Sequence, residues 1–237
     1  MGLCEPPFMK PIINHSWDIS IKEAKELQVS LREKLVLKSD FLLNNVSYIA
    51  GADVSYSKIS NKCYAAIVVF KYPEMDIIEK SFAIKESSFP YVPGYLSFRE
   101  APSLIEAFSQ LKTEPDILIF DSQGIAHPRR FGLASHLGVL FDKPSIGCAK
   151  NRLIGEYSEP ENVKNATSTL KIGSEIIGSV LKTKVNCKPI FISQGHKISL
   201  EDAIEIINKS TGKYRIPLPT REAHLLSNKI RLNDLNH

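Results

Sequence analysis

The segment DILIFD, at positions 116–121, constrains the fold more than any other part of the chain. Its four consecutive apolar residues are typical of a short strand that is buried on both faces of a sheet. A helical stretch, FGLASHLGVLFD at 131–142, and a second short apolar segment, PSIGCAK at 144–150, come after it. Strand, helix and strand in such quick succession predict a βαβ unit whose two strands run parallel.

Three segments rich in β-branched and aromatic residues lie upstream of this unit, at 46–57, 63–71 and 77–84. Turn residues such as Ser60-Asn61 separate them, so they are predicted to form an antiparallel three-stranded meander. Together with the βαβ unit, this order places the middle of strand 46–57 beside the strand at 116–121.

The remaining segments are predicted to be mostly helical. A capping box at Ser20 and Glu23 begins an amphipathic helix over 20–38. The other expected elements are helices at about 99–112, 200–210 and 219–231 and a hairpin of strands 176–183 and 188–195. Without an internal repeat or a Gly/Ser-rich linker, the chain is expected to form one domain over residues 1–237, with an N-terminal extension at about 1–18 and a C-terminal tail at about 232–237.

Charge and cysteine usage narrow the class of protein. The formal net charge of +4 permits a nucleic-acid partner without requiring one. No apolar segment approaches the roughly 18 residues that a membrane span needs, and the first residues lack the apolar core of a secretory signal. The four cysteines are far apart and form no CxxC pair, which favours a reducing environment. We therefore expect a cytoplasmic, monomeric protein with no membrane contact.

Three acidic residues are candidates for chemistry. Asp53 lies within the apolar strand IAGADVSY, Asp121 ends the segment DILIF, and Glu100 lies near the start of the helix between them. A carboxylate in an apolar strand is costly unless it is paired or bound to a cation, and two on neighbouring strands repel each other. Oxygen ligands suit Mg²⁺ or Mn²⁺, and the chain has no zinc-ligand spacing. The alternative is that both aspartates simply end strands and hydrogen-bond to turns.

Five segments in order resemble the endonuclease V family. They are GADVSY, PYVPGYLSFREAP, DSQGIAHPRRFGLASHLGVLFDKPSIGCAK, GHKISLEDA and PTREAH. The similarity extends from about residue 20 to about residue 228, and five long motifs in this order are highly specific. It implies an α/β, ribonuclease H-like fold, with a central mixed five-stranded sheet of the meander plus parallel strands, flanked by helices.

The resemblance also implies an activity. Members of this family hydrolyse DNA with the help of Mg²⁺, for which Mn²⁺ substitutes. They cut the second phosphodiester bond 3′ of deoxyinosine, leave 3′-hydroxyl and 5′-phosphate ends, and so start the repair of deaminated DNA. Both double- and single-stranded DNA with deaminated bases are expected substrates.

The matching motifs assign catalytic roles to five residues. Asp53 and Asp121 would be metal ligands, and Glu100 would bind the metal through water or orient the nucleophilic water. Lys150 would neutralise charge at the scissile phosphate, because a lysine suits a phosphate as a point charge. His224 would lie at the edge of the metal site, near the attacking water; the alternative is a solvated histidine on a helix.

The segment FPYVPGY contains a stiff turn with an aromatic tip. Pro90 and Pro93 restrict the backbone on both sides of Tyr91 and Val92, and Gly94 allows a sharp turn into the helix that carries Glu100. Such a tip can wedge into a base stack when a base leaves it, and the resemblance assigns this role to the PYVP segment. The alternative is that Tyr91 packs on its own loop.

The loop SQGIAHPRR is expected to line a base pocket. Gln123 and Gly124 are predicted to bring backbone groups close to a flipped hypoxanthine, where a backbone N–H would favour it over adenine. His127, Arg129 and Arg130 are predicted to contact the pocket or phosphates, although arginine pairs in loops are often only solvated. The loop departs from the family pattern at Ser122, where glycine is usual, and beyond it Gln194 replaces a usual proline.

Two other functions compete with DNA repair. An inosine-specific endoribonuclease would use the same catalytic residues, and the 2′-hydroxyl contacts that would decide are not visible in a sequence. A non-catalytic binder of kinked or damaged nucleic acid would predict the loss of one or more of the three acids, yet all three are present.

Overall fold

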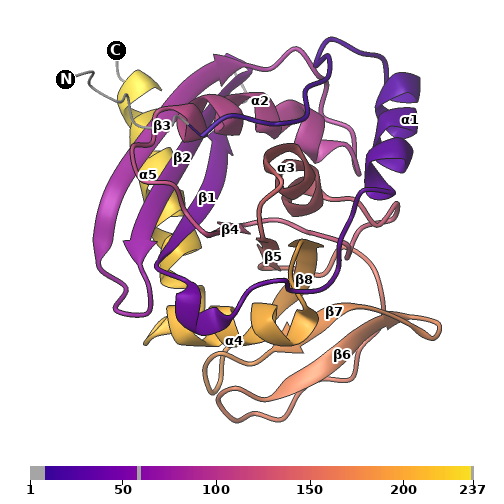
Figure 1. Ribbon diagram of the computed structural model, residues 1–237, viewed down its shortest axis with the longest axis vertical. Coiled ribbons are helices and arrows are strands. Elements are labelled where there is room, and N and C mark those ends of the chain that lie inside the picture. Colours follow the sequence, from indigo (N-terminus) through magenta and orange to yellow (C-terminus); the bar gives the residue numbers. More distant parts are fainter. Residues whose placement is uncertain (1–8, 58–59, 236–237) are drawn as a thin grey trace.

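The fold is built on one mixed sheet with helices on both of its faces (Figure 1). The computed structural model describes residues 9–57 and 60–235. Within these residues the sheet has eight strands in the order β3-β2-β1-β4-β5-β8-β7-β6.

The predicted meander and βαβ unit form the first five strands. They are β1 (Tyr48–Tyr56), β2 (Lys62–Lys71), β3 (Ile77–Glu86), β4 (Ile117–Phe120) and β5 (Ser145–Ala149). β1 pairs with β2 and β2 with β3 in the antiparallel sense, whereas β4 lies parallel to both β1 and β5. The expected placement of strand 46–57 beside strand 116–121 is confirmed by the pairing of β1 with β4.

The prediction of a five-stranded sheet is wrong, because three more strands extend it beyond β5. β8 (Ile190–His196) pairs antiparallel with β5, and β7 (Glu175–Leu181) pairs with β8, so the predicted hairpin is part of the main sheet. β6 (Thr167–Ile172) completes the edge and was not predicted. Leu170 is its only buried residue, so this strand carries almost none of the apolar pattern that identifies the others.

Five α-helices and one short 3₁₀ helix, η1 (Leu43–Asn45), accompany the sheet in the described residues. The α-helices are α1 (Ile21–Arg32), α2 (Leu96–Ser109), α3 (Leu133–Phe141), α4 (Leu200–Thr211) and α5 (Leu218–Leu235). The capping box of Ser20 and Glu23 is confirmed. α1 nevertheless ends before residue 38, because Val36 bonds to the end of β8: its N–H donates to the His196 ring and its carbonyl accepts from Lys197.

Strand β4 separates two apolar cores. Leu118 and Phe120 pack with α2 and α3 on one face of the sheet, and Ile117 and Ile119 pack with α4 and α5 on the other. All four residues are fully buried, which confirms a strand covered on both faces. The alternation matters for function because it sends the side chains next to Phe120 and Ala52 toward the α5 side.

Both ends of the described chain pack against the domain. The backbone N–H groups of Ile12 and Ile13 donate to the Leu140 carbonyl of α3, at 2.8 and 3.2 Å. α5 continues to Leu235, so most of the segment expected as a tail is helical. The rest of the expected extension and tail, residues 1–8 and 236–237, lies outside the described residues. Among the helices described, none is long and apolar enough to cross a membrane.

Candidate active site

Asp53 and Asp121 lie next to each other at one edge of the central strands. The parallel register pairs Ala52 with Phe120, and the Asp121 N–H donates to the Ala52 carbonyl at 3.1 Å. Their side chains are only 10% and 9% exposed. The fold therefore holds two carboxylates in adjacent, poorly hydrated positions, where each disfavours the negative charge of the other.

Each carboxylate contacts side chains from a different neighbouring element. The Asp53 Oδ2 atom accepts from His224 Nδ1 at 3.1 Å and from Ser227 Oγ at 2.8 Å, both on α5. Asp121 accepts a charge-assisted hydrogen bond from Lys150, which follows β5. In the described part of the chain neither side chain caps a turn, so the simple strand-end alternative does not describe these aspartates.

The geometry of three side chains suits a metal ion. Asp53, Asp121 and His224 each offer one ligand atom, and these atoms lie within 4.8 Å of one another. Glu100 lies outside this group of three but close enough to interact with it. Burial raises the pKa of Glu100 well above its usual range, and the negative charges of Asp53 and Asp121 raise it further. The three acids named from the sequence thus share one electrostatic environment.

The groups that surround the acids shift the pKa values of individual site residues in different directions. Burial raises the pKa of Asp121, whereas its hydrogen bond from Lys150 lowers it. The hydrogen bond to Asp53 raises the pKa of His224, so the charged imidazolium is favoured there. His224 is 46% exposed, but its contact with Asp53 makes it part of the site rather than a freely solvated helix residue. A proton donor and an ammonium group therefore flank the acids.

A cavity of about 440 Å³ opens beside Asp121 and Lys150. Its wall includes residues from the proline-rich turn, from the loop after β4 and from the segment after β5. Those predicted from the sequence are Tyr91, Val92, Pro93, Gln123, His127 and Lys150. Ser122 also lines it, and the Ser122 Oγ and Gln123 Oε1 atoms are buried without a hydrogen-bond partner among the described residues. These two atoms therefore have hydrogen-bonding capacity that the described protein does not use.

Comparisons with known proteins agree with this geometry. A sequence model of the endonuclease V family matches residues 29–225. The endonuclease V of Dictyoglomus thermophilum is 46% identical over 211 residues, which cover 89% of this chain and 91% of that protein.

The chain belongs to the endonuclease V family.

Solved structures of family members have the same fold. The endonuclease V of Streptomyces avermitilis superposes with a TM-score of 0.89 at 37% identity, covering 95% of this chain and 98% of that one. The Ciona intestinalis endonuclease V superposes with a TM-score of 0.77 at 32% identity, covering 91% and 98%. That protein was crystallised with a DNA 24-mer containing an inosine followed by a ribo-adenosine.

In this family member the proline-rich turn projects its aromatic tip into solvent. Tyr91 is 68% exposed, so it does not pack on its own loop. The turn ends at Gly94, whose φ of +81° is a conformation that favours glycine. The Gly94 carbonyl accepts hydrogen bonds from three side chains, which are Gln28 (3.2 Å), His127 (3.0 Å) and Arg129. We call these three donors the Gly94 clasp.

Within the Gly94 clasp, His127 and Arg129 have hydrogen-bond partners in the protein itself. His127 Nδ1 accepts from the Arg129 N–H while its Nε2 contacts the Gly94 carbonyl, a pattern that requires the neutral ring. Burial, followed by the charge of Arg129, lowers the pKa of His127 to about 4. The Arg129 guanidinium lies 4.1 Å from the ring centre of Tyr95 and donates to Gln28 Oε1 at 2.6 Å. Arg130 instead pairs with Glu175 of β7 at 2.7 Å.

The loop after β4 is held tightly against β8. The Gly124 N–H donates to Ser193 Oγ at 2.8 Å, and a Cβ atom at Gly124 would lie 2.0 Å from the Gln194 carbonyl oxygen. The Gly124 N–H is therefore used inside the protein, whereas the Gln123 backbone N–H has no partner among the described residues. Gln194, where the family usually has proline, donates to the carbonyls of Leu37 and Ile198.

Two structural partners were missed by sequence reasoning. Ser227 follows His224 by three residues, so helical periodicity alone places it on the same face of α5. Gln28 is a buried glutamine on the apolar face of α1, which is an unusual position for that residue type. Both signals are present in the sequence, but neither names the partner.

Proposed function

We propose that this protein is a DNA repair endonuclease that hydrolyses a phosphodiester bond 3′ of deoxyinosine. The observation that carries the proposal is the grouping of Asp53, Asp121 and His224 at a candidate metal site, with Asp121 also in the wall of the cavity. The proposed cut lies at the second phosphodiester bond and leaves 3′-hydroxyl and 5′-phosphate ends. The catalytic arrangement is ribonuclease H-like, with acids on two adjacent central strands, and the enzyme acts as a monomer in the cytoplasm.

The acidic site fits a hard divalent cation. Its carboxylates are close together and shielded from water, with Lys150 bonded to Asp121 and His224 to Asp53. Asp53 and Asp121 would hold Mg²⁺, or Mn²⁺ in its place, with Glu100 contributing through water and His224 at the edge. When bound, such an ion lowers the pKa of a coordinated water and offsets the charge that develops on the phosphate.

The protein groups around the acids have separate tasks. Lys150 is about one-third exposed, with its ammonium group on Asp121, and from there it neutralises charge at the scissile phosphate. Glu100 orients the attacking water. His224, whose proton is favoured by Asp53, exchanges a proton at the edge of the site. Because these groups come from rigid strands and helices, they are positioned before the substrate arrives.

The cavity provides a way to select the base. Hypoxanthine presents a carbonyl oxygen and a ring N–H where adenine presents an amino group and a ring acceptor. A Ser122 hydroxyl, a Gln123 backbone N–H and the Gln123 side-chain carbonyl supply donors and an acceptor for that edge. A site built in this way rejects adenine because its buried polar groups would then remain unpaired.

The exposed turn supplies the wedge. Pro90 and Pro93 stiffen the backbone around Tyr91 and Val92, and the Gly94 clasp fixes its far end. Tyr91 enters the base stack and fills the space that the flipped base leaves. We expect Tyr91→Ala to lose more activity on duplex DNA than on single-stranded DNA, since only the duplex must be opened. Equal losses on both substrates would contradict the wedge.

A direct assay tests the activity. Duplex DNA and matched RNA, each with a single inosine, are incubated with Mg²⁺ or EDTA, and the position of the cut is mapped. We expect a Mg²⁺-dependent nick 3′ of inosine with the wild type and none with Asp53→Ala. The absence of any metal-dependent nick near inosine would overturn the proposal.

Inosine in RNA is the second candidate substrate. The Ciona intestinalis relative was crystallised with a DNA whose inosine is followed by a ribonucleotide, which makes a 2′-hydroxyl next to the lesion worth testing here. The RNA arm of the assay decides: faster cleavage of RNA than of DNA would make the protein an endoribonuclease.

Metal binding has a test that does not depend on activity. An excess of Mg²⁺ is expected to raise the melting temperature by about 2–4 °C, because the ion binds only the folded acidic site. Asp121→Asn should abolish this shift, whereas Asp116→Asn, whose carboxylate caps the start of β1, should retain it. An equal shift in both variants would place the ion elsewhere.

A further inference from the structure

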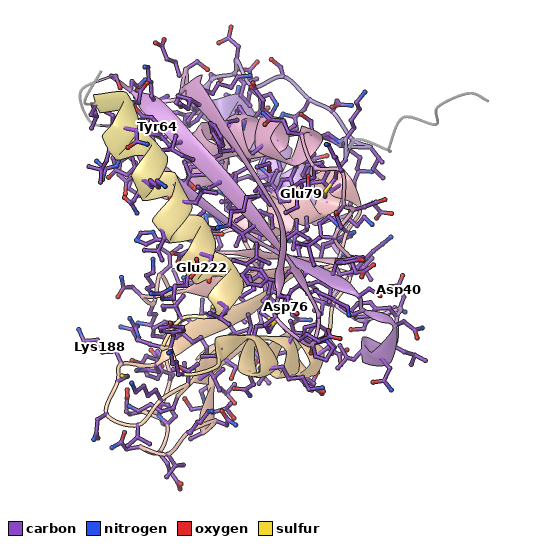
Figure 2. All side chains as sticks on the ribbon, turned by 90° about the vertical axis from the view of Figure 1, so that its left-hand side faces the viewer. Asp40, Tyr64, Asp76, Glu79, Lys188 and Glu222 are labelled. Atoms are coloured by element: carbon purple, nitrogen blue, oxygen red, sulfur yellow. The ribbon has the colours of Figure 1, made fainter. Side chains whose placement is uncertain are left out.

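A second groove lies on the opposite side of the catalytic acids from the base cavity. It has a volume of about 530 Å³ and extends along the outer end of β1 and along α5 from His224 to Leu235. Its wall includes Ser55, Tyr56, His224, Asn228, Arg231 and Leu235. Figure 2 shows α5 on this side of the sheet, from Glu222 in its first turns to Tyr64 beside its last.

A line of hydrogen bonds connects the catalytic acids to this groove. His224, Asn228 and Arg231 are spaced four and three residues apart, so they share one face of α5. His224 contacts Asp53, Asn228 Nδ2 donates to the His224 carbonyl at 2.9 Å, and Arg231 donates to Asn228 Oδ1 at 3.1 Å. The groove is thus a direct continuation of the catalytic centre.

The groove has the chemistry of a single-strand binding surface. Arg231 carries five N–H donors, and in the described part of the chain its guanidinium bonds only to Asn228. Tyr56 is 44% exposed and lies over Arg99, at 5.9 Å from the guanidinium carbon to the ring centre. Arg99 is itself fixed by the Phe89 carbonyl at 3.0 Å, so Tyr56 is a supported aromatic platform. None of the described wall residues is acidic.

The order of the strands assigns a direction to the bound nucleic acid. The base cavity adjoins Asp121, which follows β4, and Lys150, which follows β5, whereas the groove adjoins β1 and α5. Asp53 and Asp121 lie between the two. A strand whose lesion base occupies the cavity, and which is cut on its 3′ side, must therefore continue past the acids toward the groove.

We propose that this groove binds the nucleotides on the 3′ side of the cut, with a base stacked on Tyr56 and a phosphate on Arg231. This inference rests on the proposed function for its direction. A stacked base and an ionic phosphate contact are the two interactions by which proteins hold single strands without reading their sequence. The groove therefore retains the end of the product that carries the 5′-phosphate.

Substrates of different length test the direction. Single-stranded DNAs with one inosine are shortened from the 3′ end in one series and from the 5′ end in another. On the full-length DNA we expect Arg231→Ala and Tyr56→Ala each to raise KM about tenfold, and Tyr56→Phe to behave as the wild type. On DNA that ends just beyond the cut, all variants should match the wild type. Equal losses at every 3′ length, or losses that follow the 5′ length, would overturn the proposal.

The matched control is Lys229→Ala. Lys229 is an exposed cation on the same helix, but it is not among the groove residues. Its loss should leave KM unchanged at every substrate length. If Lys229→Ala and Arg231→Ala raise KM equally, the increase comes from the loss of a positive charge on α5 and not from a contact in the groove. The groove assignment then fails.

A binding experiment separates this proposal from the activity itself. The probe is a short 5′-phosphorylated oligonucleotide without inosine, and its affinity is measured by fluorescence anisotropy at several salt concentrations. Arg231→Ala is expected to weaken binding about tenfold and to reduce the salt slope by about 0.7, whereas Lys229→Ala should retain the wild-type values. This result would support the groove even if inosine DNA were not cut. Failure of the wild type to bind, or unchanged binding by Arg231→Ala, would overturn the groove even if inosine DNA were cut.

Discussion

At the scale of single residues, the most consequential contact outside the acids is the one at the Gly94 carbonyl. Gln28, His127 and Arg129 all donate to this oxygen, so elements far apart in the chain meet at the end of the proline-rich turn. Three hydrogen bonds to one carbonyl hold the end of the turn in place, since movement of the turn would break all three together. The position of Tyr91 relative to the acids depends on these bonds.

Replacing Arg129 by lysine distinguishes a clasp from a phosphate contact. Lysine keeps the charge but cannot lie flat on Tyr95 while bonding to both Gln28 and Gly94. We expect Arg129→Lys and Arg129→Ala to lower activity on duplex inosine DNA to a similar extent, about tenfold. Arg130→Lys is the control, because Arg130 pairs with the exposed Glu175 and is not one of the three donors to the Gly94 carbonyl. Full activity in Arg129→Lys would show that Arg129 acts by charge alone.

The sequence was sufficient to place Asp53 and Asp121 side by side, but not to identify the hydrogen bonds that position the site. Asp53 and Asp121 could be brought together because apolar periodicity identifies β1 and β4, and parallel pairing of the two places these aspartates side by side. The partners of Ser227 and Gln28 could not be found, because their hydrogen bonds join residues more than 60 positions apart. No local pattern reports such a contact.

At the scale of the elements, the attachment of α5 to the sheet positions the site. α5 carries His224 and Ser227, both of which contact Asp53 of β1. The helix can lie this close only because Gly51 has no side chain: a Cβ atom there would be 2.0 Å from the Pro219 carbonyl carbon. A backbone contact beneath the first turn of α5 thus sets the distance between the two α5 side chains and the acid.

Gly51→Ala is expected to damage activity more than folding. The added methyl must displace α5 or β1, which costs about 1–3 kcal/mol of unfolding free energy, and the resulting shift of His224 lowers kcat about tenfold or more. Gly173→Ala is the control: nothing lies within 4 Å of its added Cβ, and its φ of +57° costs about 1 kcal/mol without touching the site. Urea unfolding and steady-state kinetics measure both effects. Wild-type kcat in Gly51→Ala would contradict the argument.

Element prediction succeeded where a local signal existed. The cap at Ser20 begins α1 as expected, and α4 begins at Leu200, at the start of the helix expected over about 200–210. β6 escaped prediction because it is an exposed edge strand held by β7 rather than by burial. The end of α1 was misplaced because the chain after Arg32 bonds to the end of β8, and tertiary contacts of this kind override helical periodicity.

At the scale of the whole molecule, the sheet lies between the cavity proposed to hold the base and the groove proposed to hold the 3′ strand. The cavity draws on α1, α2 and α3, whereas the groove draws on β1 and α5. The acids lie between them, with Asp53 on β1 and Asp121 directly after β4. The same architecture buries several histidines on the α3 side. Burial lowers the pKa of His15, His127, His136 and His196, although the Asp142 carboxylate partly opposes this at His196.

These histidines make the folded state sensitive to acid. In the folded protein the pKa of each lies below the ordinary value of about 6.5, so the unfolded chain binds more protons as the pH falls below that value. The stability that they contribute is complete above about pH 6.5 and is lost as the pH falls toward the folded value. For His127, with a folded pKa of about 4, the loss between pH 7 and pH 5 is about 2 kcal/mol.

His127→Gln should therefore reduce the loss of unfolding free energy between pH 7 and pH 5. The variant loses hydrogen bonds of the Gly94 clasp and is expected to be less stable than the wild type at pH 7, but it has no ring to protonate. The difference between the two proteins should shrink by about 2 kcal/mol from pH 7 to pH 5. Urea unfolding in EDTA measures this, since without divalent ions the response of the acids to pH is common to both proteins. If the stability of the two proteins changes with pH in parallel, the folded protein accommodates a charged imidazole beneath the proline-rich turn. The neutral ring assigned to His127 would then be wrong.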